Sequence, residues 1–529
     1  MRYGKTLKDI REMPLPSFED LMGMENKLIR EERLYDHEQL EKEWSERVGQ
    51  LNTDQLLVYE DVIEAVSSDK GGLMFLYGHG GTGKTFLYST ISASAARSNK
   101  IVLNVASSGI FNILHVKSIS VPIAFGSILR TGEKSQLAEL IRMASLIIWD
   151  EAPMDNRFAF EALDRTLRDV MAFQNPEAEW KIFGGKVVLL GGDFRQVLPI
   201  IPKGSRQDVV QASISRSSLW NECKVYTLRK SMRVIEGEGS EQKQQRHRLF
   251  NEWLLAMGGG NLEASAEDNE EEATWIKIPE QYIGSLGELE KVVAEMYPDF
   301  DFKHNDENYL RERAILTPLN ETADFINNYM AGLLPGDEVT YRSCDEICSS
   351  STECEDHFTS YPTEYLNSLV LQGVPHHELK LKVGMPVMLL RNISPVRGLC
   401  NGTRLIITRL GQFIVEGKII TGSKVGHRVM IPRIVMTSSD TKIPFVLKRR
   451  QYPLRPCYAM TINKSQGQSL NHVGVYLPKP VSIHGQLYVA ASRTTSPEGL
   501  RFYIDDREQV YKGHTRNIVY KEVFNNLTN

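Results

Sequence analysis

The sequence is poor in cysteine and lacks long apolar runs. Six of its 529 residues are cysteines, scattered along the chain, a usage typical of a reducing compartment rather than of a disulfide framework. No run of eighteen apolar residues occurs, and the first residues lead into charged sequence without an apolar signal core. We therefore expect a soluble, non-secreted protein without membrane contact. Its length and its 41% hydrophobic residues predict three or four globular domains.

Three cysteines and a histidine lie near one another in sequence, at Cys344, Cys348, Cys354 and His357. Their spacing lacks the paired Cys-x-x-Cys that is typical of structural zinc sites. We therefore do not predict zinc here.

Positive charge is concentrated in the C-terminal part of the chain. The net charge is −5, yet residues 380–529 hold 23 Lys and Arg against 7 Asp and Glu, a balance of +16 that leaves −21 for residues 1–379. A basic region of this size attracts polyanions such as nucleic acids. Charge alone does not exclude a basic surface that is only solvated. The same two readings apply to Lys448-Arg449-Arg450.

A glycine-rich segment follows the apolar run at 73–77 and precedes a helical pattern. Strand, glycine loop and helix in this order form a phosphate-binding loop, in which backbone N–H groups surround the phosphates. The lysine can reach the β and γ phosphate oxygens, and the last hydroxyl can bind Mg²⁺. The sequence therefore predicts binding of ATP or a related triphosphate through Gly78, Gly80, Gly81, Thr82, Gly83, Lys84 and Thr85.

Two further apolar strands end in polar residues that suit the same site. The strand at 146–149 is followed by Asp150 and Glu151, placed to hold Mg²⁺ and to orient and deprotonate a water molecule, respectively. The strand at 187–190 leads to Gln196, a neutral group able to sense the γ-phosphate. Earlier, Gln55 begins a helix capped by Asn52 or Thr53, and its amide suits the two-sided edge of adenine.

Two stretches near the C-terminus combine small polar and basic residues. Residues 458–469 include Lys464, Ser465, Gln466 and Gly467, a mixture suited to phosphate groups. Residues 485–493 form an apolar helical run that ends in Arg493. Taken alone, that arginine is more typical of an exposed position.

Together these segments resemble successive motifs of superfamily 1 DNA helicases. The resemblance is to the petite-integration-frequency (PIF) family, in the form carried by Helitron transposons. It rests on residues 78–85, 150–154, 162–169, 191–196, 232–233 and both C-terminal stretches, and spans about residues 51–504.

The resemblance implies an ATP-dependent, Mg²⁺-requiring DNA helicase that moves 5′ to 3′ on single-stranded DNA and unwinds duplex DNA. It implies catalytic roles for Lys84, Glu151, Gln196, Arg233 and Arg493, and nucleotide contacts from Gln55 and Gly467. Contacts to DNA are implied for Ser108, Lys464, Ser465 and Gln466. A nuclear location and roles in DNA repair, recombination and telomere maintenance are further expectations from the family.

One segment departs from the family pattern. Where the family has a glycine-rich turn with Thr-x-His-Ser that contacts DNA, this chain has an unrelated sequence at 110–122. Three hypotheses therefore stay open: an active helicase, a single-stranded-DNA-binding protein with an impaired motor, and a phosphate-loop ATPase or kinase acting on another substrate.

The expected fold is α/β, with two RecA-like parallel-sheet domains and a β-barrel insertion in the second. We expect a charged helical lead-in at 1–50, the first domain at 51–255, a connection at 256–308 that is mobile where glycine and acidic residues cluster, and the second domain at 309–529. The barrel is expected at about 395–450, where short alternating segments are separated by glycines.

Overall fold

A computed structural model provides the three-dimensional structure. It describes residues 26–33, 37–106, 135–232, 241–266, 274–285, 289–347, 361–371, 373–394, 397–422, 424–438, 443, 445–505, 512–525 and 527. Of the four residues considered as zinc ligands, Cys348, Cys354 and His357 lie outside these residues. The altered segment 110–122 also lies outside them. No described helix is long and apolar enough to cross a membrane.

The first domain is built on a five-stranded parallel sheet. Its strand order is β2-β3-β4-β1-β5. The strands are β1 (Gly72–Gly78), β2 (Ile101–Ala106), β3 (Ala144–Asp150), β4 (Val187–Gly192) and β5 (Cys223–Leu228). The strands predicted at 73–77, 101–105, 146–149 and 187–190 are therefore confirmed, because short β-rich apolar runs in a phosphate-loop context have few alternatives.

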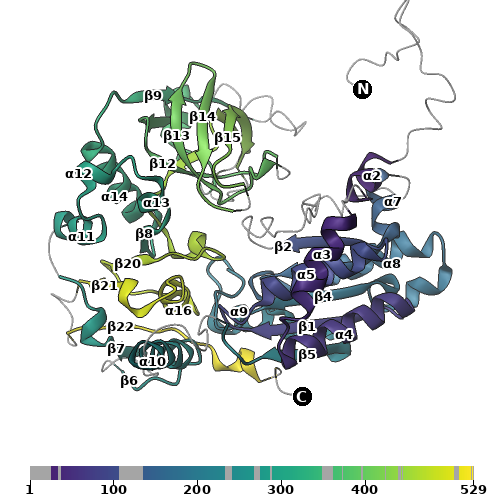
Figure 1. The fold of residues 1–529 in the computed structure, drawn as a ribbon. Helices are drawn as coiled ribbons and strands as arrows, with labels where there is room; N and C mark the ends of the chain where they lie inside the picture. Colours follow the sequence, from purple (N-terminus) through teal and green to yellow (C-terminus); the bar gives the residue numbers. More distant parts are fainter. Residues whose placement is uncertain are drawn as a thin grey trace, which may run out of the picture.

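Helices cover both faces of this sheet (Figure 1). Along β1, Leu73, Phe75 and Tyr77 enter one hydrophobic cluster, whereas Met74 and Leu76 enter another. The first cluster includes residues of α7 (Gln136–Met143) and α8 (Arg157–Ala172); the second includes residues of α4 (Thr53–Ser68) and α5 (Lys84–Arg97). Burial of alternate residues on opposite faces is why the strands read as continuous apolar runs. The first cluster also includes Ile29 of α2 (Lys27–Arg33) and Val210 of α9 (Arg206–Ala212), and Leu40 of α3 (His37–Val48) packs on α5.

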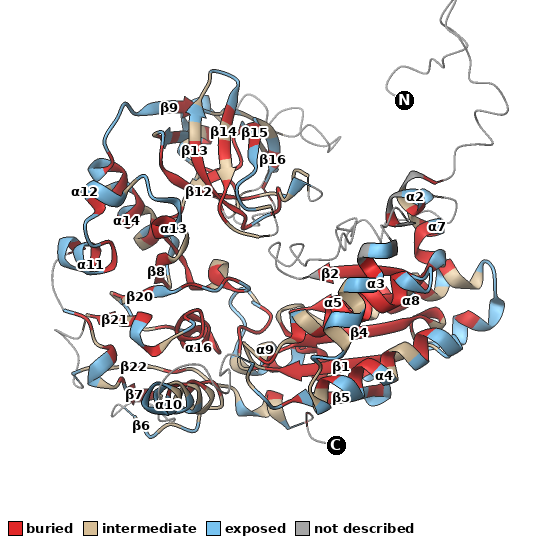
Figure 2. Ribbon diagram, in the orientation of Figure 1, coloured by how far each residue is buried: buried red, intermediate tan, exposed pale blue. Residues whose placement is uncertain are grey.

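The second domain has a four-stranded parallel sheet in the order β19-β8-β20-β21. These strands are β8 (Arg313–Thr317), β19 (Ala459–Thr461), β20 (His472–Leu477) and β21 (Leu500–Ile504). In β8, Ala314 and Leu316 pack with α10 (Glu241–Gly258) and α16 (Gln486–Ala491), while Ile315 shares a cluster with α11 (Leu289–Met296) and α14 (Asn320–Leu333). Figure 2 shows α16 buried throughout.

Three segments lie elsewhere than the domain expectations place them. The first is α10, most of which is expected in the first domain but which packs with β8 and α16 of the second. Within 256–308, β6 (Ala264–Ser265) and β7 (Trp275–Lys277) pair in one sheet with β22 (His514–Arg516), and α11 packs into the second core. At the other end, Val523 and Leu527 are buried in the hydrophobic cluster of the first domain. The chain therefore returns to its first domain at its C-terminal end, a long-range contact that local sequence patterns do not encode.

The segment of the chain between β8 and β19 forms antiparallel sheets. One sheet has the order β15-β14-β13-β12-β18 and two smaller ones have the orders β10-β17-β16 and β11-β9. Among the described strands these sheets are open, so the closed barrel is not confirmed. The strands are β9 (Val339–Arg342), β10 (Cys344–Ile347), β11 (Glu378–Leu381), β12 (Pro386–Leu389), β13 (Arg404–Leu410), β14 (Ile414–Ile419), β15 (Arg428–Pro432), β16 (Ile434–Thr437), β17 (Leu447–Gln451) and β18 (Leu454–Pro456).

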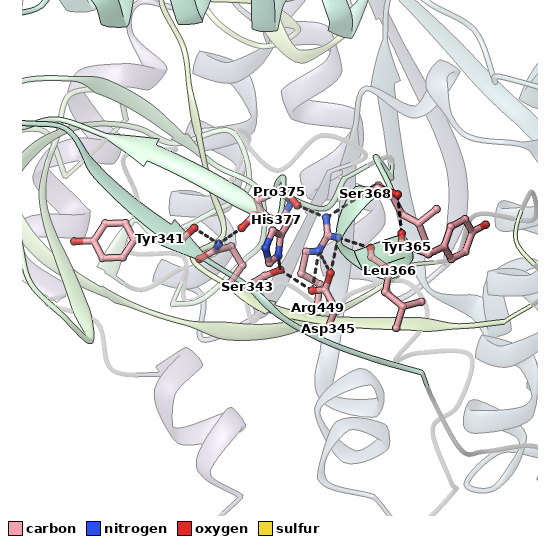
Figure 3. A network of polar contacts seen from close by, with 11 residues as sticks. Tyr341, Ser343, Asp345, Tyr365, Leu366, Ser368, Pro375, His377 and Arg449 are labelled. Atoms are coloured by element: carbon pink, nitrogen blue, oxygen red, sulfur yellow. Dashed lines mark hydrogen bonds and ion pairs between the residues drawn. The ribbon is translucent and has the colours of Figure 1, made fainter. Parts of the chain in front are cut away.

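A buried ion pair organises one side of this insertion (Figure 3). Arg449 and Asp345 have side chains that are 1% and 0% exposed, and their closest N–O distance is 2.6 Å. The guanidinium also donates hydrogen bonds of 3.0–3.1 Å to the carbonyls of Leu366, Leu369 and Pro375. Arg449 is therefore a structural residue that fits neither a phosphate-binding nor a solvated cluster, and both readings stay open for Lys448 and Arg450 alone. A Lys-Arg-Arg run in a strand points alternate side chains to opposite faces, so Arg449 faces inward.

Replacing Asp345 tests this pair. Asp345→Ala would leave the Arg449 charge buried without its partner, and we expect a loss of about 3–5 kcal/mol in local stability. Glu378→Ala is the matched control, because it breaks an ion pair to Arg342 whose side chains are 48% and 73% exposed, and we expect at most about 1 kcal/mol from it. Hydrogen exchange measures each effect locally, in β10 and β17 for Asp345→Ala and in β9 and β11 for Glu378→Ala. Equal protection in the two variants would contradict a structural role for the pair.

Candidate active site

The phosphate loop lies between the end of β1 and the start of α5. Gly81 and Gly83 have φ angles of +90° and +80°, which L side chains rarely adopt. Gly83 is the N-cap of α5 and supplies no side-chain hydrogen bond, so the first N–H groups of the helix are not capped by a side chain. Lys84 donates a hydrogen bond to the Gly78 carbonyl. Uncapped N–H groups beside a lysine form an anion site.

Gln55 supports the loop from α4. Its Nε2 donates to the Thr82 carbonyl at 3.1 Å, and its Oε1 accepts from the backbone N–H of Asn52 at 3.1 Å. The side chain is fully buried. The predicted contact of Gln55 with adenine stays a prediction, because each end of the amide already has one partner within the protein.

An acidic pair follows β3 at the same edge of the sheet. Asp150 and Glu151 are 3% and 8% exposed. Burial raises the pKa of Asp150, although the positive charge of Lys84 opposes that rise. Burial and the negative charge of Asp150 together raise the pKa of Glu151 to about 7. A carboxyl group that titrates near neutral pH can accept a proton from a bound water molecule.

Arg493 brings positive charge to the acidic pair from the second domain. Its guanidinium is 5% exposed and donates to the carbonyls of Val489 and Gln468 at 3.0 and 3.3 Å. Its charge, like that of Lys84, lowers the pKa of Glu151 against the effect of burial. Residues from the first and second domains therefore act electrostatically on one carboxylate.

The loop after β4 makes the direct contact between the two domains. The Nε2 of Gln466 donates to Oε1 of Gln196 at 3.3 Å, and both side chains are buried. Beside this pair, the Tyr488 hydroxyl donates to Asp193 at 2.8 Å. Gln196, expected to sense the γ-phosphate, thus lies where first-domain and second-domain residues meet.

The residues expected to contact DNA differ in exposure. Lys464 is partly exposed, and burial together with the nearby charge of Arg455 lowers the pKa of its amine to about 8. Ser465 is fully buried and its hydroxyl donates to the Ile462 carbonyl at 2.7 Å, so it holds the turn rather than facing solvent. Gly467 is exposed, with φ +74°. The DNA and nucleotide contacts assigned to these residues stay predictions.

Two expected site residues lie outside the described residues. They are Ser108, expected at the DNA, and Arg233, expected at the phosphates. The residue before Arg233 is described: the backbone N–H of Met232 donates to the Gly81 carbonyl at 2.7 Å. The described chain therefore reaches the phosphate loop at position 232.

Sequence reasoning missed three polar partners of the site. The Tyr88 hydroxyl donates to Asp150 at 3.3 Å, from one turn after Lys84 on α5. Asp193 and Tyr488, which pair across the domain boundary, complete the set. The i, i+4 spacing of Lys84 and Tyr88 is a usable sequence signal, whereas nothing local in sequence links residue 193 to residue 488.

The residues fit a nucleoside triphosphate with Mg²⁺. A Cβ on Gly83 would lie 2.5 Å from Nε2 of Gln55, so the loop has no room for a side chain there. Thr85 is exposed at the start of α5, and Asp150 supplies a buried carboxylate. The described residues contain no group of three or more His, Cys, Asp or Glu that could hold a metal. Mg²⁺ is commonly bound by one or two protein oxygens together with substrate phosphates, which suits this pair.

Comparisons with known proteins match different parts of the chain to the same kind of protein, the Pif1-type helicases. Residues 50–268 match the family described as PIF1-like helicase, and residues 364–410 match the DNA helicase Pif1 2B domain. The chain is 26% identical to rat ATP-dependent DNA helicase PIF1 over 82% of its own length and 59% of that protein. With the human protein the identity is 25%, over 85% and 60%. The chain therefore spans about 60% of the length of these relatives.

Solved structures share the fold. The Pif1 helicase of Candida albicans superposes with a TM-score of 0.61 at 20% identity, covering 90% of this chain and 97% of that one. A Bacteroides Pif1 bound to single-stranded DNA gives a TM-score of 0.56 at 19% identity, covering 84% and 91%. The two RecA-like domains are thus an arrangement that this chain shares with those proteins.

Gly83→Ala tests the geometry of the phosphate loop. Its φ of +80° and the approach of a new Cβ to Gln55 should cost about 1–3 kcal/mol and weaken binding of a nucleoside triphosphate at least about tenfold. Gly332→Ala is the control, because a Cβ there meets nothing within 4 Å and alanine favours the helix by up to about 1 kcal/mol. Thermal melting and nucleotide titration measure both. Unchanged binding in Gly83→Ala would contradict the assignment of the loop.

Proposed function

The chain belongs to the PIF1-like helicase family, and we propose that it is an ATP-dependent helicase that moves along single-stranded DNA and separates duplex DNA. The observation that carries this proposal is the convergence of charge on Glu151. Lys84 from the first domain and Arg493 from the second both lower its pKa, so the groups needed for hydrolysis come from both sides of a domain boundary.

Hydrolysis requires a water molecule, a proton acceptor and compensation of phosphate charge. Glu151 orients the water and accepts its proton, which its pKa of about 7 permits at neutral pH. Lys84 binds the β and γ phosphates, and Gln196 responds to the γ-phosphate. Arg493 compensates the charge that develops on the phosphate, a role worth about 10³–10⁵ in rate for comparable enzymes. Thr85 and Asp150 would hold Mg²⁺, which would supply further positive charge at the phosphate oxygens.

Movement follows from the contacts between the domains. Gln196 and Asp193 belong to the first domain, and their partners Gln466 and Tyr488 belong to the second. Binding and loss of the γ-phosphate at Gln196 therefore change the position of one domain relative to the other. Single-stranded DNA held near Lys464 is pulled along, and each separated base pair opposes the motor by about 1.4 kcal/mol of stacking.

Several finer statements rest on the family. We propose 5′-to-3′ movement, contacts to DNA from Ser108, Lys464 and Gln466, contacts to the nucleotide from Gln55 and Gly467, and a role for Arg233 at the phosphates. Ser465, whose hydroxyl is buried on the Ile462 carbonyl, serves the DNA by shaping the turn that carries Lys464. We also propose a nuclear location and work in DNA repair, recombination or telomere maintenance. The +16 balance of residues 380–529 supports a DNA partner.

An unwinding assay tests the proposal. Duplexes with a 5′ or a 3′ single-stranded tail are incubated with ATP and the protein, and strand separation and phosphate release are measured. We expect unwinding of the 5′-tailed duplex, DNA-stimulated hydrolysis, and loss of both in Lys84→Ala because the phosphates lose their cation. Lys70→Ala is the control, since Lys70 pairs only at the surface with Glu64, at 70% and 72% side-chain exposure.

The outcomes separate the alternatives. DNA binding without stimulated hydrolysis in the wild-type protein would favour the impaired motor. Hydrolysis that does not respond to DNA would favour a phosphate-loop enzyme with another substrate. Unwinding that survives in Lys84→Ala would contradict the assignment of the nucleotide site.

The lowered pKa of Lys464 predicts a pH dependence of DNA binding. Its amine loses its charge as pH rises through about 8, and binding of a phosphate favours the charged form, so affinity should fall between pH 7.5 and 9.5. Lys464→Arg should bind with less pH dependence, because a guanidinium stays charged throughout this range. Lys464→Met should bind more weakly than wild type at pH 7.5, and the difference should shrink toward pH 9.5, where the wild-type amine is largely uncharged. Fluorescence anisotropy of labelled single-stranded DNA measures the three proteins, and identical pH profiles for wild type and Lys464→Arg would place Lys464 away from the DNA.

A further inference from the structure

His484 lies between the two domains, just before α16. Its side chain is fully buried. Its Nε2 lies 2.8 Å from the Phe194 carbonyl of the first domain, and its Nδ1 accepts from the backbone N–H of Tyr520 at 2.8 Å. A carbonyl can only accept and an N–H can only donate, so Nε2 carries the hydrogen and the ring is neutral. Burial lowers the pKa of His484 to about 4, which agrees with this state.

The residues that hold His484 from the other side form a strap, residues 512–525. The strap begins in the second domain, where β22 pairs with β7 and the Ile518 carbonyl accepts from the Gly485 N–H at 3.0 Å. It ends on the first domain, where Val523 is buried in the core. There Glu522 accepts two hydrogen bonds of 3.0 and 2.9 Å from Arg206. Figure 1 shows this end of the chain, in yellow, beside the first sheet.

His484 touches the first domain within two residues of Gln196. Phe194 is itself fixed, because its ring is fully buried and lies 5.3 Å from that of Phe75. The Phe194 carbonyl is held by its hydrogen bond from His484. Gly485, which follows His484, packs so close to the Arg195 carbonyl that a Cβ at this position would lie 2.3 Å from it. The backbone that leads to Gln196 is therefore held on the second-domain side by His484 and Gly485.

We propose that His484 is a positioning residue for ATP hydrolysis: it sets the backbone that presents Gln196, and the strap holds His484 in place. The inference rests on the proposed function. Any movement of the second domain relative to the first displaces His484 or breaks its bond to Phe194. The bond therefore links domain position to the residue that senses the γ-phosphate. The charged groups that act on His484 are Asp193, Arg206 and Glu522.

Two substitutions of His484 each keep one hydrogen bond of the ring and remove the other. In His484→Gln the amide nitrogen can reach the position of Nε2 and keep the bond to Phe194, while the bond from Tyr520 is lost. In His484→Asn the shorter side chain can accept from Tyr520 in place of Nδ1, while the bond to Phe194 is lost. Both variants are made in the full chain, with kcat and KM for ATP measured at saturating single-stranded DNA and thermal melting recorded alongside.

We expect His484→Asn to lower kcat about tenfold with less than about a threefold change in KM, and His484→Gln to keep kcat within about threefold of wild type. Lys70→Ala is the control, because Lys70 pairs at the surface with Glu64, at 70% and 72% side-chain exposure, and touches neither ring bond nor the strap, so it should leave kcat unchanged. Equal kcat in His484→Asn and His484→Gln would overturn the proposal. Should His484→Asn not fold, a kcat of His484→Gln more than tenfold below wild type overturns it.

A double-mutant cycle distinguishes a positioning role of His484 from a purely structural one, because only a positioning role makes the effect of His484→Asn on kcat depend on Gln196. In a Gln196→Ala background, His484→Asn should lower the remaining kcat by less than about twofold, because the residue that His484 positions is gone. The same tenfold loss in both backgrounds would show that His484 acts elsewhere. Absence of DNA-stimulated hydrolysis in the wild-type chain, read before any variant is compared, would contradict the proposed function and the inference with it.

Discussion

Buried negative charge at the carboxyl edge of the first sheet is the constraint on which the assembly depends. Asp150, Glu151 and Asp193 are all less than a tenth exposed, and burying charge without compensation is costly. Lys84 compensates part of it from the phosphate loop. Arg195 of the first domain pairs with Asp193 at 3.4 Å, and the second domain adds the charge of Arg493 and the hydroxyl of Tyr488. The domain boundary is thereby tied to the site where the phosphates are expected to bind.

This arrangement has a mechanical consequence. A bound triphosphate would add negative charge beside carboxylates that already depend on cations from both domains. The balance between the first and second domain then changes with each phosphate that is bound or released. Because interfaces of packed side chains favour discrete arrangements over continuous deformation, such a change moves domains as units. A motor needs this property, and here it follows from where the charges are buried.

Arginine has two different uses in this chain. Arg449 is buried in the antiparallel insertion, where its guanidinium organises Asp345 and three backbone carbonyls. Arg493 is equally buried, yet its charge acts on Glu151 at the domain boundary. Arg449 lies in a basic strand and Arg493 follows an apolar helix, and both belong to the basic C-terminal part. Composition thus predicts how much positive charge this part holds but not which arginines can reach a ligand.

The sequence by itself determined four of the five strands of the first sheet, the phosphate loop and the acidic pair, because each is a short pattern whose chemistry is local. The fifth strand, β5, was not predicted, since it mixes buried and exposed residues. Apolar runs ending in glycine or carboxylate predict strand ends, and parallel strand ends meet at one edge. Tertiary structure alone decided that Gln55 braces the loop, that Ser465 is buried, that residues 256–308 and 512–525 join distant parts of the chain, and that His484 lies between Phe194 and Tyr520. Those contacts join residues between 3 and 316 positions apart through packing. Most of them have no periodic signal, since nothing in either partner's local sequence specifies the other.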